Sequence, residues 1–172
     1  MDVQRARLVR TLLDGTAWVE RTRDFARALR SAGHESGGLL LVGTPDDEPW
    51  HLTAHLDDEA RYSQIPELTP TLVRHRVPPG APPHLAVDLR RLQDAGRRDT
   101  LLVVAPDEVP AGLLERFDDA RRRGTTLLAL ESGDRELRSL AHEALTVVDP
   151  ADREPDSPAR GEPLWPSTPL QP

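Results

Sequence analysis

The feature that most constrains the fold of this chain is a series of short, continuous apolar runs bounded by turn-forming residues. These runs lack the alternation of polar and apolar positions that a half-exposed strand shows. Unbroken runs of this length are typical of strands that are buried on both faces, as in a parallel sheet covered by helices. The runs that predict strands are 39–42, 101–104, 125–130 and 145–148, with 71–73 as a weaker fifth.

Segments with apolar residues at steps of three and four separate these runs, which predicts helices between the strands. Strands that alternate with helices indicate a parallel sheet with right-handed crossovers and helices on both faces. We therefore expect an α/β fold, a three-layer α/β/α sandwich with a five-stranded parallel sheet, doubly wound in the flavodoxin-like manner. The predicted helices are 3–31 with an interruption at Gly15, 49–62, 84–95, 110–123 and 134–143.

The chain of 172 residues has room for one domain, which we place at residues 1–149. The composition changes in residues 150–172, which hold seven of the 17 prolines and few apolar residues. Such a segment is typical of an extended or disordered tail. Two roles stay open for this tail, a solvated terminus or an anchor in which Trp165 docks on the domain or on a partner.

Composition excludes several classes of chemistry. The absence of Cys removes disulfides, thiolate nucleophiles and Cys-ligated zinc, and every basic residue is Arg, so no Schiff-base or P-loop lysine exists. The net charge of -7 and the few aromatic residues argue against nucleic-acid binding. No apolar run approaches the ~20 residues of a membrane helix, and no apolar signal core follows Met1. We expect a cytoplasmic protein, and the Arg, Ala and Pro bias is typical of a GC-rich bacterium.

The order of elements and several short motifs resemble the sugar isomerase (SIS) domain family over residues 16–149. The resemblance is greatest in residues 99–149 and continues in the strand and glycine turn at 39–44. Within the family, the chain looks closest to small single-domain members of the sedoheptulose-phosphate isomerase type and related domains of unknown function. The motifs that carry it are Asp99-Thr100-Leu101-Leu102-Val103-Val104, Ala120 to Gly124, Leu127 to Leu130, Leu140-Ala141 and Glu143 to Val147.

The resemblance implies a phosphosugar site at the C-terminal edge of the sheet, where turns after the first and third strands present amides and hydroxyls. Helix N-termini at such turns attract anions. Here the first turn keeps Gly43 and Thr44, and Ser132 remains after the fourth strand, but the third turn has no Ser, Thr or Gly. Carboxylates fill both main turns instead, as Asp46 and Asp47 and as Asp107 and Glu108.

These carboxylates predict that a phosphate is disfavoured, because they carry the same charge as the ligand. Two interpretations stay open. Asp107 and Glu108 line a ligand site together with Gly43, Thr44 and Ser132, or all four acids only cap the following helices. The resemblance therefore implies a degenerate SIS domain. We expect a non-catalytic module that binds a phosphosugar-like carbohydrate derivative, or a regulatory one. The resemblance also implies a homodimer formed through the flanking helices, so Trp18 and Phe25 are candidate interface or core residues.

Two alternatives to this function remain. The first alternative is an active phosphosugar isomerase that uses Glu131, Thr44 and Ser132. Glu131, at the end of the fourth strand, is the best-placed carboxylate to act as a base. In a protein-interaction module, the dimer surface and the tail carry the function.

A divalent metal site is a further candidate. His51 and His55 are four residues apart on a predicted helix, so both rings share one face, with acidic residues nearby. The alternative is an exposed pair at a surface, since no Cys and no H-E-x-x-H pattern completes a zinc site. Apart from this site we expect no cofactor.

Overall fold

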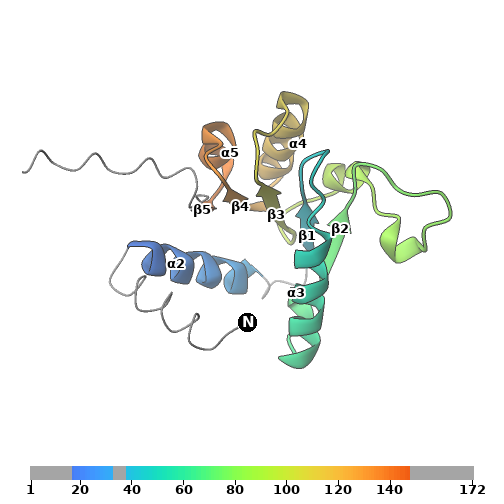
Figure 1. The fold of residues 1–172 in the computed structure, drawn as a ribbon, viewed down its shortest axis with the longest axis horizontal. Coiled ribbons are helices and arrows are strands. Elements are labelled where there is room, and N and C mark those ends of the chain that lie inside the picture. The colour runs from blue at the N-terminus through green and yellow to red at the C-terminus, as the bar shows by residue number, and fades with distance from the viewer. Residues whose placement is uncertain (1–16, 33–37, 148–172) are drawn as a thin grey trace, which may run out of the picture.

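The computed structural model describes residues 17–32 and 38–147. Helices and strands alternate along most of this region, and η marks short 3-10 helices (Figure 1). The elements in chain order are α2 (Ala17–Ala32), β1 (Leu39–Val42), α3 (Trp50–Tyr62), η1 (Pro66–Leu68), β2 (Pro70–Val73), η2 (Pro83–Leu85), η3 (Leu89–Gln93), β3 (Thr100–Ala105), α4 (Ala111–Arg122), β4 (Thr126–Glu131), α5 (Arg135–Leu140) and β5 (Glu143–Thr146).

The five strands form one parallel sheet in the order β2-β1-β3-β4-β5. Figure 1 shows α2 and α3 on one side of the sheet and α4 and α5 on the other. This strand order is that of flavodoxin-like doubly wound folds. The predicted fold class, a three-layer α/β/α sandwich with five parallel strands, is confirmed.

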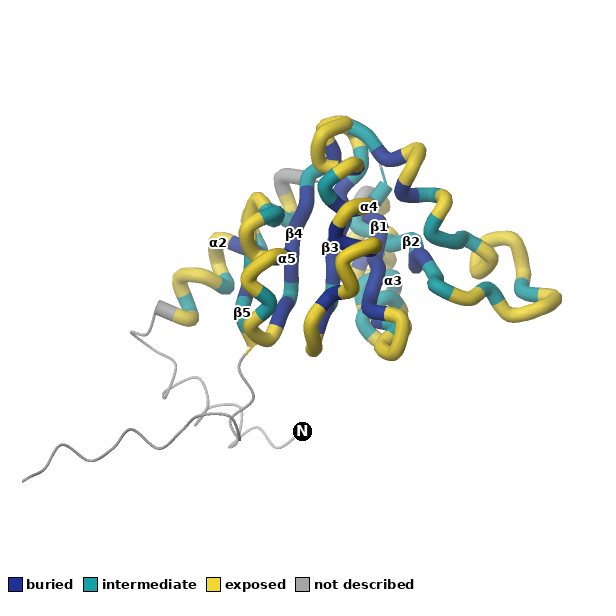
Figure 2. The backbone as a smooth tube through the Cα atoms, turned by 90° about the horizontal axis from the view of Figure 1, so that it is seen from above, coloured by how far each residue is buried: buried dark blue, intermediate teal, exposed yellow. Residues whose placement is uncertain are grey.

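Burial follows the expectation for strands that are covered on both faces (Figure 2). All four residues of β1 are buried, and they alternate between two cores. Leu40 and Val42 belong to the core beneath α4 and α5, whereas Leu39 and Leu41 belong to the core that contains Phe25 of α2. The continuous apolar run in the sequence therefore reflects two buried faces.

The predicted helix over 84–95 is wrong. This segment forms only η2 and η3, with Asp88 in extended backbone between them. The Arg74 amide donates to the Val87 carbonyl at 2.9 Å, so the segment extends the edge of the sheet beside β2. The Asp88 side chain then accepts from the Arg90 amide and starts η3. The crossover from β2 to β3 thus lacks a full helix, and three of the four expected inter-strand helices are present.

Smaller differences concern the last two elements. Helix α5 ends at Leu140 rather than at residue 143, and Glu143 already opens β5. The His142 Nδ1 atom accepts from the Leu127 amide at 3.0 Å, while the His142 amide donates to the Leu127 carbonyl at 2.8 Å. These two bonds pair the chain with β4 just before Glu143. The strand therefore starts earlier than the apolar run at 145–148 indicates.

Other predictions lie partly outside the described residues, namely helix 3–31 before Ala17, the boundary at 149, and the tail at 150–172 with Trp165. Of the two predicted interface or core residues, Phe25 is buried and Trp18 is exposed. No helix within 17–32 and 38–147 is long and apolar enough to cross a membrane.

Candidate functional site

The candidate site lies at the C-terminal edge of the sheet, between two neighbouring strands whose following helices lie on opposite faces of the sheet. Strands β1 and β3 are neighbours, and the chain leaves β1 toward α3 on one face and β3 toward α4 on the other. Ligands of doubly wound sheets bind at such a switch point, outside the carboxyl ends of the strands. Because β4 pairs with β3, the structure brings the turns that follow β1, β3 and β4, at 43–49, 106–110 and 132–134, to one edge.

The loop after β1 is packed tightly against its own backbone. A Cβ atom on Gly43 would lie 1.9 Å from the Asp47 carbonyl oxygen and 2.7 Å from Pro49 Cδ. Only glycine permits this close approach without a shift of the backbone. The Thr44 carbonyl accepts from the Asp47 amide at 3.3 Å, and Thr44 is buried. Backbone atoms of the loop itself therefore fill the space inside this turn.

Two side chains that follow β2 hold this same loop. The Arg74 guanidinium donates to both carboxylate oxygens of Glu48, with its shortest contact at 2.7 Å from Nη2. His75 Nε2 donates to the Gly43 carbonyl at 2.9 Å. Hydrogen bonding to Glu48 raises the pKa of Arg74 above its ordinary value, and the charge of Glu48 adds to this against the cost of burial. We call these two contacts the clasp.

The acidic residues of the two main turns do not cap the following helices. Helices α3 and α4 begin after Pro49 and Pro110, and neither has a side-chain cap. The interpretation that these acids cap the helices through side-chain hydrogen bonds is therefore wrong. All four are exposed and together make an acidic rim on both sides of the switch point: Asp46, Asp47, Asp107 and Glu108.

Glu131, at the end of β4, is fully enclosed, with 1% of its surface exposed. One carboxylate oxygen accepts from Arg138 Nη2 at 2.8 Å, Arg138 Nε at 3.0 Å and Thr146 Oγ1 at 2.6 Å. The other oxygen accepts from the Gly133 amide. The neighbouring Ser132 is exposed, and its amide donates to the Ala105 carbonyl. The carboxylate of Glu131 thus joins β4, α5 and β5.

Asp134 holds the loops after β3 and β4 together, a role that sequence patterns do not reveal. One oxygen accepts from the Leu137 amide at 2.9 Å and caps α5, and the other accepts from the Val109 amide at 2.8 Å. The only signal in the sequence is an Asp at a helix start, which predicts the cap but not the bridge to Val109. The Val109 and Leu137 amides, which lie at the starts of α4 and α5, are thus bonded to a carboxylate of the chain itself.

A pocket of about 420 Å³ opens between the N-terminal ends of α4 and α5. Glu108, Gly133 and Asp134 are among the residues that line it, so one of the predicted ligand-binding residues reaches it. Arg135 and Glu136 add one charge of each sign. The pocket therefore offers hydrogen-bond partners of both kinds, within a mostly acidic rim.

His51 and His55 lie on the exposed side of α3, and the His51 ring stacks on Trp50 with the ring centres 3.5 Å apart. Among the residues that the structure describes, no group of three or more His, Asp and Glu side chains converges to hold a metal. The metal site predicted from this pair stays a prediction, without a third ligand from this part of the chain.

The comparisons with known proteins are distant. One similar solved structure is the sugar isomerase domain of an RpiR transcription factor from Sphaerobacter thermophilus, at 14% identity and a TM-score of 0.47, over 76% of this chain and 70% of that chain. Another is a "putative sugar-phosphate isomerase" from Listeria monocytogenes, at 12% identity and a TM-score of 0.47, over 88% and 79%. No family model matches this chain, and neither does any curated protein. The likeness concerns the fold alone and assigns no residue a role.

Proposed function

We propose that this chain is a non-catalytic SIS-like domain that binds a carbohydrate derivative lacking a phosphate and acts as a regulatory module. The observation that carries the proposal is the set of carboxylates at the C-terminal edge. Glu131 and Asp134 accept from the Gly133, Val109 and Leu137 amides, which removes these donors from an incoming anion. The strand order and the motifs of residues 99–149 support the carbohydrate class of ligand.

The enclosure of Glu131 supports the absence of isomerase activity. A general base must come within hydrogen-bond reach of the proton that it removes. The Glu131 carboxylate is fully buried, and Arg138, Thr146 and the Gly133 amide already donate to it. The acidic rim adds repulsion of a phosphate dianion, which a neutral or amine-bearing sugar does not feel.

Thermal unfolding of the full chain with D-glucose 6-phosphate, D-glucose and D-glucosamine tests the proposal, together with an isomerisation assay on sugar phosphates. We expect an unphosphorylated sugar to raise the unfolding midpoint by about 5–10 °C at 100 times its dissociation constant. We expect no turnover. Turnover of a sugar phosphate, stabilisation by the phosphate alone, or no stabilisation by any of the three would overturn the proposal.

A matched pair of variants isolates the effect of the rim. Asp107→Asn with Glu108→Gln removes two negative charges at the C-terminal edge, whereas Asp94→Asn with Glu143→Gln removes two exposed charges elsewhere. We expect only the first pair to strengthen the binding of inorganic phosphate, by about fivefold, since exposed charge pairs have effects of this size. Equal effects of the two pairs would show that only the net charge matters.

A further inference from the structure

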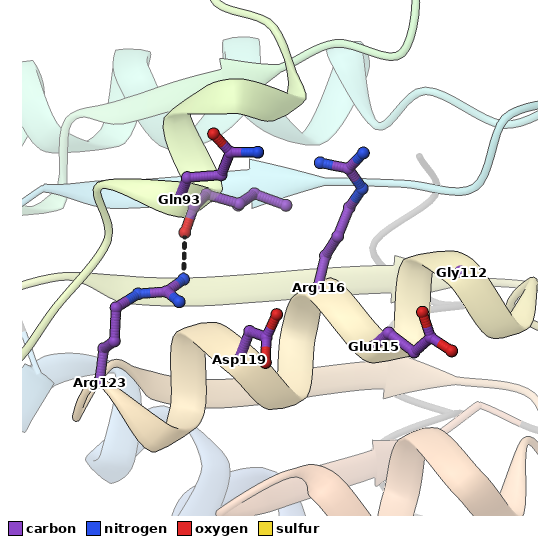
Figure 3. A pocket seen from close by; sticks show the side chains of 7 residues that line it. Gln93, Gly112, Glu115, Arg116, Asp119 and Arg123 are labelled. Carbon is purple, nitrogen blue, oxygen red and sulfur yellow. Dashed lines mark hydrogen bonds between the residues drawn. The ribbon is translucent and has the colours of Figure 1, made fainter.

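A second pocket lies along α4 in the groove between η3 and α4, and it shares no lining residue with the first (Figure 3). Its volume is about 390 Å³, which falls in the range of small-molecule sites. The groove lies beside the crossover from β2 to β3, where η3 takes the place of a full helix. Its polar lining consists of Gln93, Glu115, Arg116, Asp119 and Arg123.

The two walls of this groove, η3 and α4, are held together by hydrogen bonds from the end of α4 to the backbone of the crossover. The Arg123 guanidinium donates to the Leu92 carbonyl at 2.8 Å and to the Ala95 carbonyl at 3.2 Å. Leu92 itself is buried in the core. The Arg123 guanidinium therefore already bonds within the chain, and its position fixes the spacing between η3 and the end of α4.

The α4 wall of the groove carries three charges that the described residues leave unpaired. Glu115, Arg116 and Asp119 make no ion pair within residues 17–32 and 38–147, whereas Asp118, which does not line the groove, pairs with Arg122 at 2.6 Å. Glu115 and Asp119 are four residues apart, so their like charges repel each other across one helical turn. Figure 3 shows Arg116 and Asp119 rising from α4 on the side where Gln93 lies.

We propose that this groove binds a free basic amino acid. The unpaired charges follow the order negative, positive, negative, and the complementary ligand carries two cations and one anion. An α-carboxylate would pair with Arg116, and the α-ammonium and side-chain cation would pair with Asp119 and Glu115. Binding of these cations relieves the repulsion between the two carboxylates, and the Gln93 amide offers a further hydrogen bond to the carboxylate.

Titration of the full chain with L-lysine, followed by NMR of the backbone amides, tests this inference. We expect shift changes at Gln93 and along residues 112–123. Nα-acetyl-L-lysine lacks the α-ammonium and 1,5-diaminopentane lacks the carboxylate, and each should bind about fivefold more weakly than L-lysine, as for the loss of one exposed ion pair. Binding of the diamine as tight as that of L-lysine would overturn the role of Arg116.

Two variants and one control locate the site. Asp119→Asn and Arg116→Gln should each weaken L-lysine binding by about fivefold, whereas Asp118→Asn should change it less than twofold, since Asp118 lies outside the groove. Equal weakening of L-lysine binding by Asp118→Asn would show that only the net charge of the protein matters, and it would overturn the assignment of the site to this groove. A lysine-containing peptide that binds more tightly than free L-lysine would show that the groove serves a protein partner instead. Because no residue lines both pockets, failure here leaves the carbohydrate proposal standing.

Discussion

The two halves of the C-terminal edge are held closed by different kinds of interaction. On the β1 and β2 side, the clasp joins Arg74 to Glu48, and both side chains are 22% exposed. On the β3 to β5 side, Glu131 is fully buried and Asp134 is partly buried, and both accept from backbone amides. A buried carboxylate that loses its charge leaves its donors without their anionic acceptor, whereas water can take the place of a partner in a partly exposed ion pair. The comparison predicts unequal costs for breaking the two halves.

The largest effect is expected for Glu131→Gln. The amide of glutamine keeps the shape of the side chain but leaves Arg138 without an anionic partner. Its NH₂ group would also face the donors of Arg138 or Thr146 in place of an accepting oxygen. We expect the free energy of unfolding to fall by about 3 kcal/mol, the lower end for breaking a buried pair, because Arg138 is half-exposed. Denaturant unfolding measures this loss. The exposed Glu143→Gln is the control and should change stability by less than about 0.5 kcal/mol.

An intermediate effect is expected for Asp134→Ala. This change removes the cap of α5 and the acceptor of the Val109 amide, each of which contributes about 1 kcal/mol, so unfolding should become easier by about 2 kcal/mol. Hydrogen exchange should speed up at the Val109 and Leu137 amides first. Asp107→Ala, an exposed neighbour without a capping bond, serves as control. Equal destabilisation by both changes would contradict the bridging role of Asp134.

The smallest effect is expected for the clasp. A double-mutant cycle on Arg74→Met and Glu48→Gln should give a coupling energy of about 1 kcal/mol, because the pair is partly buried and bonded through two nitrogens. The same cycle on Arg61 and Asp57, in which Arg61 is 74% exposed, should give about 0.3 kcal/mol and weaken further in salt. A clasp coupling as large as the loss from Glu131→Gln would remove the contrast between the two halves.

The strands and most helices could be predicted because their signals are local. The apolar runs coincide with β1, β3 and β4, and the apolar face of 110–123 coincides with α4. The helix over 84–95 could not be excluded locally, since Leu85, Leu89 and Leu92 have helical spacing. Pairing of Val87 with Arg74, thirteen residues earlier in the chain, interrupts that helix.

The candidate site was predictable only as a set of loops at one edge. The sequence by itself determined that Gly43, Thr44, Glu131 and Ser132 follow buried strands and that the main turns are acidic. Only the tertiary structure decided which carboxylates are buried and what they bind. Glu131 meets Thr146 and Arg74 meets Glu48 across neighbouring strands, and those neighbours are set by the order β2-β1-β3-β4-β5. Strand order depends on packing of the whole sheet, so no local pattern encodes these pairs.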